Sequence, residues 1–251
     1  AQNFPFLSAP GGDRDAFALS VVPGTKEPFY LKGDLFSSRL STRVSKVTLS
    51  EDNSAVIERK NVKSGSAGAS FRDTYRFMGA EDQVKDLTES LSKDYPNLVI
   101  SDFTIQDIHN VGHDLEYAYK FEVPYYLVEA SSMKLLKLPW ADNLETRRSL
   151  STETRDHDYL YRVPMDTLWE EMQVILPAGY EPLDLEETLS LNSEMAEYKV
   201  DITYEDGVIT ATRRVVNKMS IISPEKYPEF KEYYNQAVRA DERQILLRKT
   251  R

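Results

Sequence analysis

The amino-acid sequence predicts an α+β fold that is mainly antiparallel β, organised as β-sandwich-like domains that each carry a packed helix. The strongest observation is Asp206-Gly207 between two alternating segments, because Asp-Gly tolerates the positive φ angles of a tight hairpin turn. Apolar residues also recur at helical spacing in residues 84–95 and 230–238. Aromatic residues make up 11% of the 251 residues and include 15 tyrosines, which suits pleated, half-buried strands.

The first predicted strands lie in residues 44–49 and 55–57, because a polar turn at 51–54 separates two apolar segments. We expect residues 69–77 to add a further hairpin strand. The small residues of 64–70 predict a flexible loop before it. No Lys-Ser/Thr follows the glycines of this loop, so it does not fit a phosphate-binding loop.

Residues 81–95 predict a helix, because four apolar side chains share one face: Val84, Leu87, Leu91 and Tyr95. Two acidic residues occupy its first turn, where the helix dipole favours anions, and Pro96 ends it. Strands are expected at 98–105 and 115–123. The second of these alternates apolar and polar residues, which indicates a sheet with one buried face.

The chain divides into three segments by composition. Residues 1–35 are rich in Pro and Gly and are interpreted as a linker or as the tail of a preceding domain. Periodicity is lost around 137–155, which predicts a boundary between a β-rich domain at 36–140 and a C-terminal domain at 141–251. In the second domain we expect a helix at 228–238, a turn at 177–180, and strands at 169–175, 196–203, 208–216 and 244–248.

Charge and composition exclude several classes of function. There are 41 acidic and 31 basic residues, so the net charge of −10 disfavours nucleic acid as a partner. The apolar runs are far shorter than the roughly 20 residues that span a bilayer, so no membrane span is expected. The first residues do not resemble a signal peptide. The chain has no cysteine, which removes a thiolate nucleophile, disulfides and thiolate zinc sites, and no cofactor is predicted.

Catalytic and metal-binding candidates are weak. His109 and His113 are four residues apart with acidic residues nearby, but Asn110-Val-Gly112 reads as a turn, so we predict no metal site. His157 lies between two aspartates without a nucleophile pattern and is interpreted as a surface histidine. Acidic pairs such as Asp13 with Asp15 and Glu186 with Glu187 are too common here to indicate catalysis, and no catalytic residue is assigned.

Aromatic and arginine pairs give the candidate binding residues. Tyr125, Tyr126 and Trp140 could form a platform for a sugar or a peptide, although cross-strand packing is the alternative. Arg147-Arg148 and Arg213-Arg214 could hold an anion. Neighbouring strand residues point to opposite faces, so only one of Arg213 and Arg214 could contribute, and a solvated strand face is the default reading.

Three segments carry a resemblance to a known family: LPAGYEPLDLEE at 176–187, YKVDITYEDGVITATRRVV at 198–216, and the stretch from 222 to 249. They resemble the C-terminal accessory, unknown-function region of transglutaminase-like proteins of Bacteroidetes and related Gram-negative bacteria, in the papain-like cysteine protease superfamily. ASFRDTYRF at 69–77 and LEYAYKFEVP at 115–124 are similar to the segment that follows the transglutaminase core. Residues 1–22 resemble the exit from that core.

The resemblance implies a non-catalytic region that supports, positions or gates a preceding transglutaminase-like domain of the same polypeptide. The catalytic Cys, His and Asp of the family have no counterparts here, because the chain contains no Cys. The resemblance also implies export to the periplasm or cell surface. The alternatives are an independent extracellular glycan- or peptide-binding module with a protein or glycan ligand, and a hydrolase that uses His109, His113 and acidic residues.

Overall fold

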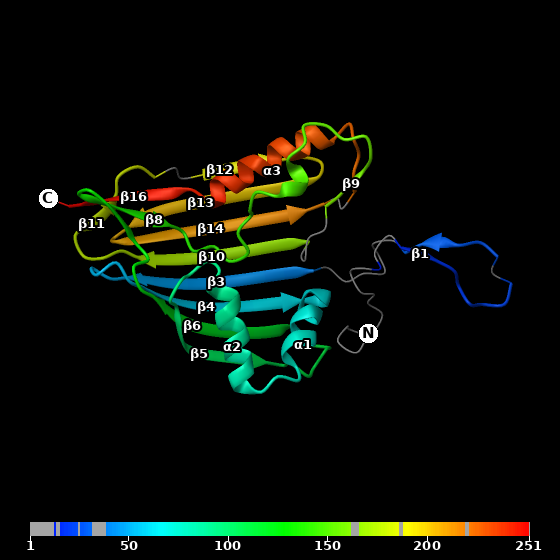
Figure 1. Cartoon of the computed structure of the whole chain (residues 1–251), viewed down its shortest axis with the longest axis horizontal. Coiled ribbons are helices and arrows are strands. Elements are labelled where there is room, and N and C mark those ends of the chain that lie inside the picture. Colours follow the sequence, from blue (N-terminus) through cyan, green and yellow to red (C-terminus); the bar gives the residue numbers. More distant parts are fainter. Residues whose placement is uncertain are drawn as a thin grey trace.

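The computed structural model describes residues 13, 16–24, 26–31, 39–161, 166–185, 188–218 and 221–250. An eight-stranded sheet dominates them (Figure 1). All neighbouring strands in it are antiparallel except β10 and β3, which are parallel. Its strands, in spatial order, are β12 (Thr188–Asn192), β13 (Ala196–Glu205), β14 (Val208–Asn217), β10 (Thr167–Ile175), β3 (Leu40–Leu49), β4 (Ala55–Ser64), β6 (Leu115–Val123) and β5 (Val99–Gln106).

A second layer covers one face of this sheet. Helices α1 (Ala69–Tyr75) and α2 (Ala80–Leu91) lie near the β5 end, and α3 (Tyr227–Asp241) lies near the β12 end (Figure 1). A four-stranded sheet completes the layer, with β11 (Tyr180–Pro182), β16 (Gln244–Lys249), β8 (Met133–Lys137) and β7 (Val128–Ala130). The minor elements are the strand pairs β1 (Phe17–Ala18) with β2 (Phe29–Tyr30) and β9 (Tyr159–Leu160) with β15 (Ile221–Ile222), and the 3₁₀ turns Gly65–Gly68 and Arg148–Leu150.

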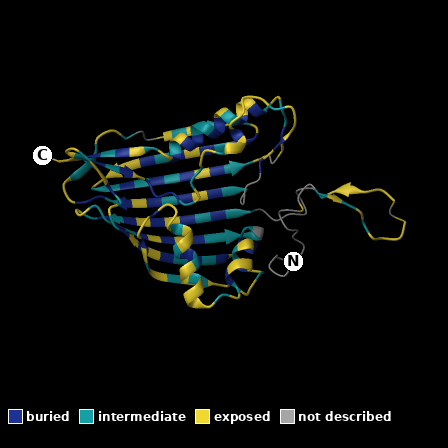
Figure 2. Ribbon diagram, viewed as in Figure 1, coloured by how far each residue is buried: buried dark blue, intermediate teal, exposed yellow. Residues whose placement is uncertain are grey.

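Burial alternates along the long strands, so one face packs against the second layer and the other faces solvent (Figure 2). The solvent face carries cross-strand ion pairs. Lys120 Nζ lies 3.1 Å from Glu58 Oε1, and Lys60 Nζ lies 2.7 Å from Glu116 Oε2. Exposed pairs of this kind contribute little stability, so the fold depends on the buried face.

The predicted fold class is confirmed, and so are its best local signals. Asp206 and Gly207 have φ angles of 48° and 81°, as a tight turn between β13 and β14 requires. The predicted C-terminal helix is α3, which has a proline in its first turn and buries Phe230, Tyr234 and Ala237. The predicted helix at 81–95 is α2, although it ends at Leu91.

The predicted strand at 69–77 is wrong, because residues 69–75 form α1. The Phe71 and Tyr75 rings stack at 4.3 Å, and Phe71 also stacks on Tyr117 of β6 at 4.2 Å. That i, i+4 spacing places both rings on one helical face. The predicted loop at 64–70 is also ordered differently, because it contains the end of β4, a 3₁₀ turn and the start of α1.

The two segments predicted as domains contribute to the same sheet. Strands β3, β4, β6 and β5 come from residues 36–140, and β12, β13, β14 and β10 come from 141–251. They join where β10 pairs with β3 over nine residue pairs, from Thr167↔Leu40 to Ile175↔Thr48. In the second layer, β8 of the first segment pairs with β16 of the second. The independence of the two segments as folding units therefore stays a prediction, which is taken up below.

Candidate functional site: a pocket beside Trp140

A pocket of about 270 Å³ lies between the C-terminal half of α3 and the strands β12 and β13. For comparison, an engineered apolar cavity of about 150 Å³ is large enough to bind benzene. Most of the described lining is apolar, with three polar side chains at Gln236, Arg239 and Arg243. The apolar lining residues are Leu138, Trp140, Leu189, Val200, Ile202, Ala240 and Ile245. An apolar pocket with a few polar groups is the usual form of a small-molecule site.

Helix and strand periodicities place these side chains together. Residues 236, 239, 240 and 243 are spaced i, i+3, i+4 and i+7, so the C-terminal part of α3 and the residues after it turn one side to the pocket. Val200 and Ile202 are two residues apart on β13, so both side chains point to its buried face. Leu189 comes from β12, an edge strand of five residues, and is only partly buried.

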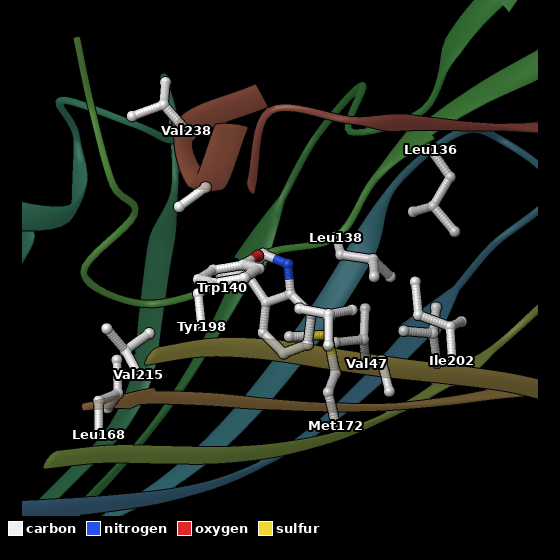
Figure 3. Packing of buried hydrophobic residues seen from close by; sticks show 14 of the residues in the cluster. Val47, Leu136, Leu138, Trp140, Leu168, Met172, Tyr198, Ile202, Val215 and Val238 are labelled. Carbon is white, nitrogen blue, oxygen red and sulfur yellow. The ribbon is translucent and has the colours of Figure 1, made fainter. Parts of the chain in front are cut away.

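Trp140 forms one wall and is almost completely buried, with 3% of its surface exposed. It follows β8 in a tight turn, in which its backbone N–H donates to the Leu138 carbonyl at 2.9 Å. The Arg213 guanidinium lies over the indole with Cζ 5.0 Å from the ring centroid, which is a cation–π contact. Figure 3 shows Trp140 among core residues from both layers, including Leu138 and Ile202 of the pocket wall.

A buried ionic network holds the segment after Trp140 against the sheet. Arg213 is fully buried and donates to Glu170 Oε2 at 2.7 Å, to the Ala141 carbonyl at 2.5 Å and to Asp241. Glu170 Oε1 accepts the Ala141 N–H at 2.8 Å. Asp241 accepts the Tyr198 hydroxyl at 2.7 Å. Buried charges need such partners, and the two carboxylates raise the pKa of Arg213 despite the opposing effect of burial.

The ionic residues form a row across the sheet. Arg213, Glu170, Arg43 and Asn61 are direct partners on the neighbouring strands β14, β10, β3 and β4. Arg43 Nε donates to Asn61 Oδ1 at 2.8 Å, and its Nη2 pairs with Asp142. This row therefore runs beneath the segment from Trp140 to Asp142 and crosses the parallel strand pair that joins the two halves.

Lys63 and Asp142 have shifted pKa values at the end of this row. Burial lowers the pKa of Lys63 to about 8, and the Arg43 charge adds to the effect while Asp142 opposes it. Partial burial raises the pKa of Asp142, but Arg43 and Lys63 outweigh it and bring that pKa down to about 2. Half of the Asp142 side chain is exposed, so this end of the row meets solvent.

The three predicted aromatic binding residues have different surroundings. Tyr125 is 82% exposed and has a positive φ of 57°. Tyr126 donates its hydroxyl to the Lys137 carbonyl and packs 6.2 Å from the Tyr95 ring. Trp140 is buried and lines the pocket. Binding by these residues stays a prediction, and Trp140 is the one for which the structure provides a cavity.

Most of the predicted polar candidates are either exposed or bonded to neighbouring side chains. His109 and His157 are exposed, and His113 Nδ1 lies 3.8 Å from Asp107 Oδ2. The described residues contain no group of three side chains that could hold a metal ion. Arg147 donates to the Tyr234 hydroxyl at 2.9 Å, and Arg214 pairs with Glu197 at 2.8 Å on the solvent face. Asp15, Glu186 and Glu187 lie outside the described residues.

The expectation of a solvated strand face is wrong for Arg213, which is fully buried, and right for Arg214. The sequence did not lead us to predict Arg43 and Glu170 as buried charged residues. A signal for Arg43 was present, since it shares the strand phase of the apolar residues Val47 and Leu49. Charged residues are rarely buried without partners, and those partners are distant in sequence.

Comparisons with known proteins give limited matches. Residues 131–247 match a family described as a domain of unknown function with a solved structure, DUF3858. No curated protein matches the chain. A solved structure described as a “putative protease” from Parabacteroides distasonis is 13% identical with a TM-score of 0.39, covering 54% of this chain and 30% of its own. Baculovirus P35 is 9% identical with a TM-score of 0.20, covering 84% and 96%. At such TM-scores neither structure supports a conclusion about fold or function.

Proposed function

We propose that this chain is a non-catalytic accessory region of an exported transglutaminase-like protein and that it docks on the preceding domain of that protein. The sequence resemblance described above and the match of residues 131–247 to a domain of unknown function support the accessory role. The lack of cysteine removes the nucleophile on which transglutaminase-like catalysis depends. Export to the periplasm or cell surface is part of the same proposal.

The observation that carries the docking proposal is the hairpin of β1 and β2, which extends away from the eight-stranded sheet (Figure 1). Its strands contain two residues each, and a two-stranded hairpin has little stability of its own. Large apolar side chains are exposed along it: Phe17, Leu19, Val21, Val22, Phe29 and Tyr30. A cluster of exposed apolar side chains usually indicates an interaction surface.

The occupant we assign to this hairpin is the transglutaminase-like domain that precedes it. Residues 1–22 resemble the exit from that domain, so β1 would leave the domain and remain packed on it. Burying one such side chain contributes about 1.5–3 kcal/mol, so several of them could hold the domains together.

The test uses the longer polypeptide and measures hydrogen exchange in the hairpin. Amide protection at 16–31 should exceed that in the isolated chain, and Phe17→Ser should reduce it. Val99→Ser is the matched control, because Val99 is equally exposed on the edge strand β5. Equal exchange in both polypeptides would refute docking at the hairpin. Undiminished activity of the longer protein without residues 36–251 would refute the accessory role.

A second candidate is an independent extracellular module that binds a glycan or a peptide, which the pocket beside Trp140 favours. A glycan and peptide array tests it with the intact chain. Tyr125→Ala should leave the fold intact because Tyr125 is mostly exposed, so a loss of binding in this variant would place the ligand at the predicted platform. An array without any specific signal would eliminate the module.

A further inference from the structure

We propose that the pocket beside Trp140 binds a medium-chain carboxylate, with its apolar chain inside and its carboxylate at Arg239. The pocket is separate from the hairpin of the docking proposal, since α3, β12 and β13 surround the pocket and the hairpin of β1 and β2 extends beyond the sheet (Figure 1). Neither the family match nor the resemblance assigns a ligand to this pocket.

The apolar part of the ligand follows from the walls. Seven of the ten described lining residues are apolar, and Trp140, Val200, Ile202 and Ile245 are each buried. A cavity with such walls is poorly hydrated, so the transfer of an alkyl chain from water into it is favourable. The volume of about 270 Å³ exceeds what a single small ring needs, which favours a chain of intermediate length.

The anionic end follows from the charges. The described lining contains Arg239, Arg243 and no carboxylate, and because Arg243 already has an interaction of its own, Arg239 is the cation considered for the ligand. Asp241, which follows Arg239 closely in sequence, is fully buried and points its oxygens at Arg213, Tyr198 and the Leu144 N–H. It therefore does not pair with Arg239.

Arg239 is the residue best placed to meet a carboxylate. It lies in the last turn of α3, and its side chain reaches the pocket although the residue is exposed. The ion pairs formed among the described residues of α3 and β16 do not include Arg239. A guanidinium can donate two parallel hydrogen bonds to a carboxylate, and an exposed position leaves room for the ligand to enter.

The experiment follows Trp140 fluorescence in a Trp169→Phe background, because the chain contains only these two tryptophans and Trp169 lies on the solvent face of β10. Hexanoate, octanoate and decanoate are titrated below their micellar concentrations. Affinity should rise about fourfold for each added methylene until the pocket is full. Octanol should bind more weakly than octanoate.

Two variants separate the apolar and ionic contributions. Ala240→Leu fills part of the pocket from a partly buried position on α3 and should abolish binding. Because the added atoms enter the pocket and not a packed core, the melting temperature should not fall. Arg239→Gln should weaken octanoate about two- to fivefold and leave octanol unchanged. Arg214→Gln is the matched control, because it removes an arginine from the opposite face of the sheet.

Three results would overturn the proposal. The first is no fluorescence change with any of the acids, and the second is binding that persists in Ala240→Leu. The third is tighter binding of an acetylated peptide with a C-terminal leucine than of decanoate, because the pocket would then recognise a chain terminus.

Discussion

Replacing Arg213 with Met is expected to destabilise the protein strongly. Arg213 is fully buried between the Glu170 and Asp241 carboxylates and also donates to the Ala141 carbonyl. Methionine keeps an unbranched apolar stem and lacks only the guanidinium end, so the change removes the charge and leaves a small space where that group was. What it leaves is two buried carboxylates without their cation, together with an unsatisfied carbonyl.

The expected cost is about 4 kcal/mol, because removing one member of a buried ionic group costs about 3–5 kcal/mol. Arg214→Met is the matched control. Arg214 is the next residue on β14, is about half exposed and pairs with Glu197 on the solvent face. Exposed pairs contribute about 0–1 kcal/mol, so the two neighbouring substitutions should differ by roughly 3 kcal/mol.

Urea unfolding followed by circular dichroism measures the difference. With a typical dependence on denaturant, a loss of about 4 kcal/mol lowers the midpoint by roughly 1–2 M. The double variant Arg213→Met, Glu170→Met should recover part of the loss, since one stranded carboxylate is removed with its cation. Equal midpoints for Arg213→Met and Arg214→Met would refute the view that the buried network anchors the fold.

Three further predictions concern other parts of the structure. The pKa of Lys63 is about 8 in the folded chain and near 10.4 in the unfolded chain. Between these values the unfolded chain binds more protons, so the free energy of unfolding should rise from pH 8 to pH 10. Urea titrations at several pH values should show this rise in the unmodified chain and not in Lys63→Met. Gly68→Ala should cost about 1–3 kcal/mol by thermal unfolding, because a Cβ there would lie 2.8 Å from Arg72 Nη1 and 3.2 Å from Leu115 Cβ, whereas Gly112→Ala meets ordinary contacts and should cost less. The predicted boundary at 140/141 is tested with the fragments 36–140 and 141–251. The first fragment exposes the edge of β3 and the second that of β10, so the two should associate when they are mixed and analysed by gel filtration. Two stably folded fragments that elute separately after mixing would contradict this expectation.

Local signals predicted most strands of the large sheet. The Asp-Gly turn joins β13 and β14, and the alternation in 115–123 coincides with β6. These elements follow from a few neighbouring residues and need no knowledge of the remaining chain. The helix α3 was equally readable because its apolar face repeats over four turns.

The error at 69–77 shows where local information ends. Phe71 and Tyr75 favour strands by propensity, and α1 has only seven residues, which is too short for a clear periodicity. Tertiary contacts decide the conformation there. Arg72 donates to the carbonyls of Asn110 and His113 at 3.1 and 2.8 Å, about forty positions along the chain.

The candidate site was harder to predict because its partners are far apart in sequence. Trp140 was selected as an aromatic residue, but its wall position depends on α3, β12 and β13 together. The parallel pairing of β3 with β10 joins residues more than 120 positions apart and has no local sequence signal. Without that pairing, Arg43 and Glu170 cannot be recognised as neighbours.

One contact links the ionic network to the pocket, and it connects the stability of the fold to ligand binding. Arg213 balances the charges of Glu170 and Asp241 and also lies over the face of Trp140, which forms a wall of the pocket. Loss of Arg213 therefore removes the cation–π contact of the indole as well as the ion pairs of the two carboxylates. In the Arg213→Met variant, octanoate binding should weaken even in buffer without urea, where the remaining core keeps the chain folded, whereas Arg214→Met should bind as the unmodified chain does.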